Sequence, residues 1–513
     1  MRVVFLQKLL PQEMLGVQWL CTALRRAGHE PRVIFLPDPA WKDALREANP
    51  GLIAFSVTTG DHSFYARVAR AAKELTGAPT IFGGPHPTFV PDMVLHDQVD
   101  FVCRGEGETA LPMLASMLEN GGDARAVPNL SRKGPGGSRV DHPLLPLHAT
   151  LDSLGFPDRE TMYASGRLYR ECERKIVLTQ RGCLYNCSFC FHHAWRDKVY
   201  RATRKDYLRK RTVEHVLAEI DWIRSKWPLK FIHFLDDIFN VDEEWLAEFC
   251  AAYPRAVGLP FDVILRTNLT TREHMQMLRS AGCISARLAF ESASDAIRNG
   301  IYRKQTTLAD LRNSAKYVRE QGIRLTTLNL LGAPGATVED ELATLQLNVD
   351  CRVDHPLCSL LQPYPETDIN DITREMGFAV DELDQFPEKF NRTTSIGFDR
   401  RHEVENLHKL FPIAVRFPAL MPWIPRAIRA KSLGQVYLAL YLLWTEYLVC
   451  EQNRSFAVAT DSANVSSLPP VDFVRRVAAK TALKARERLF GRRFSRERLR
   501  LQMQEDTIAH MNG

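Results

Sequence analysis

Residues 181–193 read RGCLYNCSFCFHH and place three cysteines, Cys183, Cys187 and Cys190, in the spacing Cys-x-x-x-Cys-x-x-Cys. Three thiols on one short loop suit the ligands of an iron–sulfur cluster. The next cysteine along the chain is Cys250, so a fourth thiol does not follow nearby. The pattern therefore predicts a four-iron cluster held by three thiolates, with one iron open to a small molecule.

Two simpler interpretations of these cysteines stay open at this point. They could form a structural zinc site, or they could be three unrelated core thiols. Structural zinc sites take four protein ligands. His192 and His193 lie close in sequence, but no second Cys-x-x-Cys pair follows to complete such a site.

The segment resembles the signature of the radical S-adenosylmethionine (SAM) superfamily, with Phe189 as the aromatic residue before the third cysteine. The resemblance implies a [4Fe-4S] cluster whose open iron chelates SAM and whose electron cleaves it to a 5'-deoxyadenosyl radical. It also implies a partial (β/α)6 barrel and an electron donor such as flavodoxin or ferredoxin.

The segment 173–375 alternates strands and helices in the way that such a barrel requires. Strands are expected at 175–180, 231–235, 262–266, 285–290, 324–331 and 358–361, and helices at 213–227, 243–252 and 308–321. The three cysteines follow the first of these strands, where the active-site loops of a barrel lie.

Residues at the ends of the later strands also resemble the superfamily in their order along the chain. The resemblance implies contacts with SAM from Asp236 and Asp237 after the second strand, Arg266 after the third, Glu291 and Ser292 after the fourth, and Gly332 and Gly335 after the fifth. Each of these residues alone is as typical of a helix cap or a turn as of a SAM contact, so the prediction depends on their order along the chain. Glu366 departs from the pattern, because many relatives have glycine there.

Residues 1–130 also alternate strand and helix, which predicts an α/β domain with a doubly wound, Rossmann-like parallel sheet. Strands are expected at 2–7, 32–36, 52–59, 80–83 and 99–103, with a helix at 17–27. Ligands of such sheets bind at the carboxyl ends of the strands. The loop after the first strand lacks the Gly-x-Gly-x-x-Gly pattern of a dinucleotide site.

This domain instead resembles a cobalamin-binding domain. That family has a glycine after the first strand, a serine ending the third and a glycine pair ending the fourth, and glycines let a flat macrocycle approach the sheet edge. Its cobalt-ligating histidine is replaced here by Glu13, a departure that cobalamin-dependent radical SAM enzymes often share. A domain of this shape that binds no cobalamin is the alternative. The resemblance implies cobalamin contacts from Glu13, Gly16, Ser56, Thr58, Gly83, Gly84, His86, Gly105 and Glu106.

The length of 513 residues and a hydrophobic content of 45% suit a multi-domain enzyme. We expect a cobalamin-binding domain at 1–130, a linker at 131–172, the barrel at 173–375 and a helical C-terminal domain at 376–513. An odd count of 11 cysteines without a secretory signal predicts reduced thiols and a cytoplasmic location. The apolar run 436–449 is too short to span a bilayer and predicts a buried helix.

The net charge of +6 arises near the C-terminus, because residues 471–500 carry eleven Lys/Arg against three Asp/Glu. The rest of the chain is therefore close to neutral, and nucleic acid is not an expected partner. Residues 473–490 place their apolar side chains along one helix face. We expect this helix to cap the barrel; peripheral membrane contact through the basic C-terminus is the alternative.

Taken together, the resemblances imply an enzyme that uses a [4Fe-4S] cluster, SAM and cobalamin to methylate an unactivated carbon of a small molecule or lipid. No residue is assigned an acid–base role, because the cofactors carry the difficult steps. A cyclase or rearrangement enzyme of the same architecture is one alternative, and a corrinoid carrier without catalysis is another.

Overall fold

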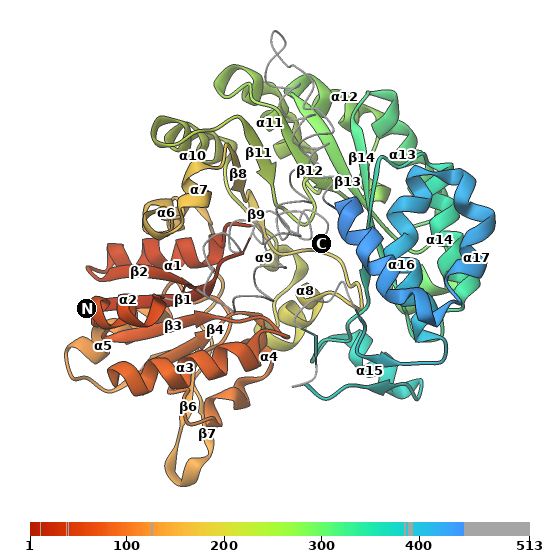
Figure 1. Cartoon of the computed structure of the whole chain (residues 1–513). Helices are drawn as coiled ribbons and strands as arrows, with labels where there is room; N and C mark the ends of the chain where they lie inside the picture. The colour runs from red at the N-terminus through yellow and green to blue at the C-terminus, as the bar shows by residue number, and fades with distance from the viewer. Residues whose placement is uncertain are drawn as a thin grey trace.

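The computed structural model describes residues 1–445 except 11, 37, 39, 125–126, 384–385 and 388–392. Two large β-sheets organise this part of the chain, the first built within residues 2–141 and the second within residues 174–360 (Figure 1). Helices cover both sheets, and the segment that joins the two sheets contains the helices α6 (Arg159–Ser165) and α7 (Arg167–Glu171).

The first sheet confirms the predicted doubly wound domain. Its core has the strand order β2-β1-β3-β4-β5, and these five strands are parallel. Val3 and Phe5 of β1 pack in one core, whereas Val4 and Leu6 pack in a second core on the other face. Burial on both faces explains the unbroken apolar run of β1. The bounds are β1 (Arg2–Lys8), β2 (Glu30–Leu36), β3 (Leu52–Ser56), β4 (Thr80–Gly83) and β5 (Phe101–Cys103), with helices α1 (Leu15–Arg26), α2 (Trp41–Ala48), α3 (His62–Thr76), α4 (Pro85–Phe89) and α5 (Ala110–Glu119).

The segment predicted to be a linker, 131–172, contains regular structure that the sequence did not indicate. The strands β6 (Leu130–Lys133) and β7 (Arg139–Asp141) extend the first sheet in antiparallel fashion. The helices α6 (Arg159–Ser165) and α7 (Arg167–Glu171) pack against the core of the same sheet. These elements are too short and too polar to give a periodic apolar signal.

The second sheet confirms the predicted partial barrel. Its six parallel strands lie in sequence order and are covered by helices whose starts are set by N-cap side chains. The caps are Thr212, Asp242, Thr271, Thr307 and Thr337. The strands are β8 (Arg174–Val177), β11 (Phe231–Phe234), β12 (Phe261–Leu265), β13 (Cys283–Glu291), β14 (Arg324–Leu331) and β15 (His355–Leu360), and the helices are α10 (Val213–Lys226), α11 (Glu243–Ala256), α12 (Arg272–Ala281), α13 (Leu308–Glu320) and α14 (Val338–Asp350).

The described part of the C-terminal region is mainly helical, as expected. Helix α16 (Arg401–Arg416) contributes Leu407 and Phe411 to the core of the barrel, so it is a layer of that core. The prediction of a buried helix at 436–449 is wrong over its described part: residues 436–445 are helical, but Val436, Leu440 and Leu443 are exposed. Hydropathy alone does not reveal which face of a helix is covered.

The basic helix predicted at 473–490 lies outside the described residues. Within the residues that are described, no helix is both long enough and apolar enough to cross a membrane.

A buried network of charges joins the first sheet to the second. The Arg159 guanidinium of α6 pairs with Glu13, from the loop after β1, and with Glu219 of α10 at 2.9 Å. Arg159 also donates to the carbonyl of Ile176 in β8 at 2.6 Å, and Arg211 pairs with Glu219. These two cations and two anions are all buried, so their charges neutralise one another without contact with water. The pairing holds the loop after β1 against the barrel.

We predict that Arg159→Met destabilises the protein strongly, because it leaves Glu13 and Glu219 buried without their shared partner. The expected loss is about 3–5 kcal/mol, seen as a lower midpoint of thermal unfolding. Arg25→Met is the matched control: Arg25 pairs with Asp158 but is 53% exposed, and its loss should cost less than about 1 kcal/mol. Equal shifts for the two variants would contradict the prediction.

Candidate functional site

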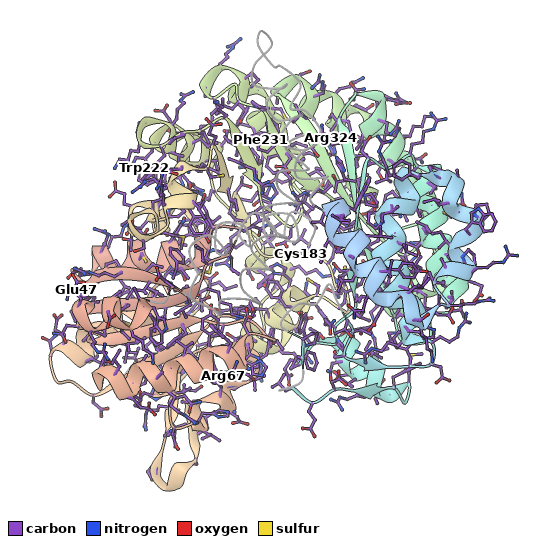
Figure 2. The ribbon with its side chains drawn as sticks, viewed as in Figure 1. Glu47, Arg67, Cys183, Trp222, Phe231 and Arg324 are labelled. Carbon is purple, nitrogen blue, oxygen red and sulfur yellow. The ribbon has the colours of Figure 1, made fainter. Side chains whose placement is uncertain are left out.

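The cysteine loop follows β8 and the short strand β9 (Gln180–Arg181) and leads into α8 (Phe191–Ala194). Figure 2 shows Cys183 near the middle of the view, whereas Phe231 and Arg324, which begin β11 and β14, lie at the opposite end of the sheet. The loop is therefore at the carboxyl edge of the second sheet, where a parallel sheet binds its ligands.

The three cysteines lie on one tightly folded loop, and their thiols are sheltered from solvent to different degrees. The backbone N–H of Cys190 donates to the carbonyl of Cys187 at 3.1 Å, which folds the loop tightly. Burial raises the pKa of Cys183 to about 11, and burial followed by the neighbouring Cys187 raises the pKa of Cys190 well above its usual value. Such thiols become thiolates when a bound cation stabilises the negative charge.

Between the last two cysteines, Ser188 and Phe189 anchor the loop to the segment that follows β13. The Ser188 hydroxyl donates to the Ile301 carbonyl at 2.6 Å. The Phe189 ring packs edge-on against Tyr302, with ring centroids 5.3 Å apart. The loop is thus held in place by the protein itself.

Asp236 and Asp237, which follow β11, bind residues on either side of the cysteine loop. Asp236 is buried and accepts hydrogen bonds from the backbone N–H groups of Thr179 and Gln180 at 2.7 and 2.9 Å. Burial raises the pKa of Asp236 to about 7 despite these bonds. Asp237 instead binds His192 Nε2 at 2.8 Å.

Arg266 and Glu291 meet at Lys304, a residue that the sequence analysis missed. Arg266 follows β12, lies over the Tyr185 ring at 3.3 Å and donates to the Lys304 carbonyl. Glu291 ends β13 with a left-handed φ of 60° and pairs with the Lys304 ammonium at 2.8 Å. Arg266 Nε has no partner among the described residues. Strained backbone and an unpaired donor are features that occur at ligand sites.

Ser292, Gly332 and Gly335 complete the set predicted at this edge. The Ser292 hydroxyl accepts a bond from the Ser294 N–H at 3.2 Å. Gly332 and Gly335 have left-handed φ values of 83° and 78°, which glycine adopts readily. The Gly332 N–H donates to Glu341 at 2.7 Å, and burial raises the pKa of Glu341 to about 8.

The residues predicted to contact cobalamin gather mostly at the carboxyl edge of the first sheet. Ser56 ends β3 and pairs in register with Gly83, which ends β4. A Cβ at Gly16, in the first turn of α1, would meet no atom within 4 Å. A Cβ at Gly84 would lie 2.9 Å from the carbonyl oxygen of Val57 and at a φ of 98°, so glycine is required there. The open space at Gly16 fits the approach of a flat ligand.

Thr58 and His86 lie in the loops beside this edge. Thr58 contacts Asp61 through its hydroxyl at 3.4 Å. His86 is buried, stacks on His62 with ring centroids 4.3 Å apart and bonds to the Thr59 hydroxyl at 3.0 Å. This stack places two imidazole rings beside the sheet edge.

Glu13 is not exposed at the edge with these residues. Its carboxylate is buried, pairs with Arg159 and accepts hydrogen bonds from the Tyr163 hydroxyl at 2.8 Å and from Gln18 Nε2 at 3.0 Å. Its acceptor capacity is therefore largely used within the protein.

Gly105 and Glu106, which follow β5, touch the barrel directly. The Glu106 N–H donates to the Tyr200 hydroxyl at 2.6 Å, and a Cβ on Gly105 would overlap that same hydroxyl. Glu106 pairs with Arg209 at 2.8 Å and with Arg181 at 3.2 Å. Burial alone would raise the pKa of Glu106, but the two guanidinium groups outweigh it and lower the pKa to about 2.

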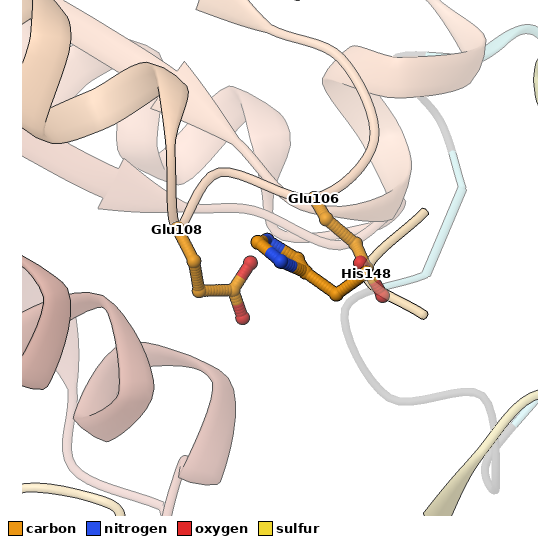
Figure 3. Close-up of side chains that lie close together, drawn as sticks. All are labelled: Glu106, Glu108 and His148. Carbon is orange, nitrogen blue, oxygen red and sulfur yellow. The ribbon is translucent and has the colours of Figure 1, made fainter. Parts of the chain in front are cut away.

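Glu106 and Glu108 lie close to His148, as Figure 3 shows, with candidate ligand atoms within 4.8 Å of one another. This grouping has the composition of a cation site. Both carboxylates are already bound to guanidinium groups, however, since Glu108 pairs with Arg181 at 2.6 Å. The negative charge is therefore neutralised within the protein, which favours an ion-pair cluster over a metal site.

These contacts bring the carboxyl edges of the two sheets face to face. The sequence matches the B12 binding domain family over residues 2–115 and the Radical SAM superfamily over residues 177–347. The chain joins a B12-binding domain to a radical SAM domain. The described edges agree with both assignments, since one carries the glycines and the other carries the three cysteines.

Several known proteins are similar to this chain. An uncharacterized methyltransferase of Pyrococcus horikoshii is 24% identical over 69% of this chain and 76% of its own length. The hopanoid C-3 methylase of Methylococcus capsulatus is 28% identical over 63% of this chain and 61% of its own length. The solved structure of the radical SAM methyltransferase TsrM from Kitasatospora setae, with cobalamin and a [4Fe-4S] cluster bound, has a TM-score of 0.61 at 20% identity, covering 73% of this chain and 75% of TsrM. This structural similarity supports the fold.

We predict that Gly105→Ala weakens the junction between the two domains. Gly77→Ala is the matched control, because Gly77 has a similar φ of 69° but open space around its Cβ position, whereas Gly105 has a φ of 74° and faces Tyr200. Both variants place an alanine at a left-handed φ, which lowers the free energy of unfolding. Gly105→Ala should lower it by about 1–3 kcal/mol more because of the clash with Tyr200. Thermal unfolding measures the difference, and equal losses would contradict the prediction.

Proposed function

We propose that this protein transfers a methyl group from SAM, by way of cobalamin, to an unactivated carbon of a small molecule or lipid. The observation that supports this most is the facing of the two carboxyl edges, joined through Glu106 and Arg181. Groups bound at the two edges would share one reaction space. The similarity to proteins named as methyltransferases points the same way.

On this proposal, Cys183, Cys187 and Cys190 hold the cluster. The bound groups supply the radical and the methyl group, which no acid–base pair could provide at an unactivated carbon. The role of the chain is to hold these groups in place and to exclude water. We assign Phe189, Asp236, Asp237, Arg266, Glu291, Ser292, Gly332 and Gly335 to the surroundings of SAM.

At the other edge, we assign the cobalamin contacts to Gly16, which borders open space, to the strand ends and the turn after them, and to the loops beside them. These residues are Gly16, Ser56, Thr58, Gly83, Gly84 and His86. Gly105 and Glu106 act instead as positioning residues between the domains, and Glu13 as an anchor within the buried ion network.

A flavodoxin or ferredoxin would supply the electron. The domain limits 1–130, 131–172, 173–375 and 376–513 remain part of the proposal. For the basic C-terminal helix at 473–490 we keep the cap on the barrel as the proposal and peripheral membrane contact as the alternative, and these residues lie outside the described part of the chain.

We predict that changing Cys183, Cys187 or Cys190 to Ala abolishes cluster binding and SAM cleavage, because three thiolates are needed to hold the cubane. Iron analysis of anaerobically reconstituted protein should give about four irons for the unchanged chain. Cys250→Ala, a half-buried cysteine outside the motif, should retain both properties. A triple alanine variant that still forms 5'-deoxyadenosine would disprove the assignment.

The by-products of SAM distinguish methylation from the alternatives. Methyl transfer gives both S-adenosylhomocysteine and 5'-deoxyadenosine, whereas cyclisation gives the second product alone. A corrinoid carrier gives neither product.

We predict that neither a protein nitrogen nor the base of the cobalamin tail ligates cobalt in the bound Co(II) form. The tail should be displaced into the first domain, and the position of the family's histidine is taken by Glu13, whose carboxylate is committed to Arg159. Electron paramagnetic resonance should show no splitting from nitrogen, and Glu13→Gln should leave the pattern unchanged. Nitrogen splitting would contradict this prediction. Purification without any corrinoid, after ample supply, would remove cobalamin from the proposal.

A further inference from the structure

Residues 406–445 form a stretch of unusual charge. They contain no Asp or Glu, although the whole chain carries 61 acidic residues, and they contain five cations. The cations are Lys409, Arg416, Arg426, Arg429 and Lys431. All charged Lys, Arg, Asp and Glu side chains of this stretch are therefore cationic, which favours anionic partners.

The same stretch exposes large apolar side chains. Trp423 and Phe417 are 63% and 51% exposed, at and beside the 3-10 helix Pro418–Trp423. Along the helical residues 431–445, four exposed residues recur at a spacing of three and four, which places them on one helix face. They are Leu433, Val436, Leu440 and Leu443, each 40–51% exposed. Together, these six residues and the cations Arg416, Arg426 and Lys431 are called the cationic apolar face.

The two parts of this face adjoin one another and are fixed to the barrel. The Phe417 ring lies 6.0 Å from the Trp444 ring, which joins the 3-10 helix to the end of the later helix. The adjoining side of the helix at residues 434–445 is docked, because the buried Tyr437 donates to the Ala427 carbonyl at 2.9 Å. Figure 1 shows α16 and α17 (Ile424–Ala427) on the side of the molecule away from the first sheet. The apolar stripe therefore points outward from a folded support.

We propose that the cationic apolar face docks the protein on an anionic lipid surface. Large exposed apolar patches mark interaction sites. Tryptophan favours the membrane–water interface, and cations beside apolar groups favour anionic headgroups. Arg426 lies 6.0 Å from the Trp423 ring and Arg416 lies 6.0 Å from the Phe417 ring, so charge and apolar surface are interleaved.

Charge also argues against two other occupants of this face, the basic residues 471–500 of the chain itself and a second copy. The chain's own residues 471–500 carry eleven Lys/Arg and three Asp/Glu, so they would repel it. A second copy joined through the same face would oppose cations to cations, because a two-fold interface pairs a patch with itself. Anionic lipid is the occupant that neutralises the charge. This inference does not depend on the proposed chemistry.

Co-sedimentation of the full-length protein with vesicles tests the proposal. Binding is expected to vesicles rich in phosphatidylglycerol, to fall at high salt, and to be weak for pure phosphatidylcholine. The triple variant Arg416→Gln, Arg426→Gln, Lys431→Gln should bind about 100-fold more weakly, and Trp423→Ser about tenfold more weakly. The matched controls are Arg67→Gln, which Figure 2 labels on α3, and Leu95→Ser, both exposed elsewhere. These should bind like the unchanged protein.

Hydrogen exchange over residues 417–443 identifies the occupant. Protection that appears on adding anionic vesicles supports the proposal. Vesicle binding that the triple variant and Trp423→Ser leave unchanged would overturn it and assign binding to another segment. Absence of vesicle binding overturns it as well: protection in the free monomer would then mean cover by the chain's own C-terminal residues, and a concentration-dependent dimer sensitive to Trp423→Ser would mean a second copy. Unchanged thermal unfolding of the variants confirms that they are folded.

Discussion

The buried guanidinium of Arg159 is the constraint on which the relation between the two domains depends. It lies between Glu13 and Glu219 and also satisfies the carbonyl of Ile176, so it touches the loop after β1, helix α10 and strand β8. Removing these charges from water is costly and is compensated only in one geometry. A displaced domain would leave a buried charge without its partner. The network therefore favours a single arrangement of the two sheets more than it adds net stability.

The second junction extends this arrangement to the cysteine loop. Glu106 and Glu108 follow β5, and both pair with Arg181, which precedes Cys183 by two residues. The pKa of Glu106 near 2 keeps its carboxylate charged at neutral pH, so the pair is retained there. The position of the glycine edge and the position of the three thiols are thereby coupled through a few charged side chains, while Tyr200 fills the space beside Gly105.

The sequence predicted the parallel strands and the cysteine loop because their signals are local: runs buried on both faces, N-caps and fixed spacing. It missed Arg159, Arg181 and Lys304, since ion pairs between distant segments leave no periodic pattern. It also missed β6 and β7, which are short and polar. The segment 436–445 was predicted to be buried because its side chains are apolar, yet burial depends on which neighbours pack against a helix, and tertiary structure alone decides this.

The barrel edge is assembled by contacts that pass from one strand end to the next. Asp236 holds the end of β8, and the side chain of Arg266 reaches the backbone of Lys304, whose ammonium pairs with Glu291 after a bulge in β13. The left-handed φ of Glu291 costs free energy that this ion pair helps to offset. Most side chains that the resemblance assigns to SAM thus already have protein partners. We infer that they pre-organise the edge, and that a ligand there meets mainly backbone groups, the unpaired Arg266 Nε and the two glycine turns.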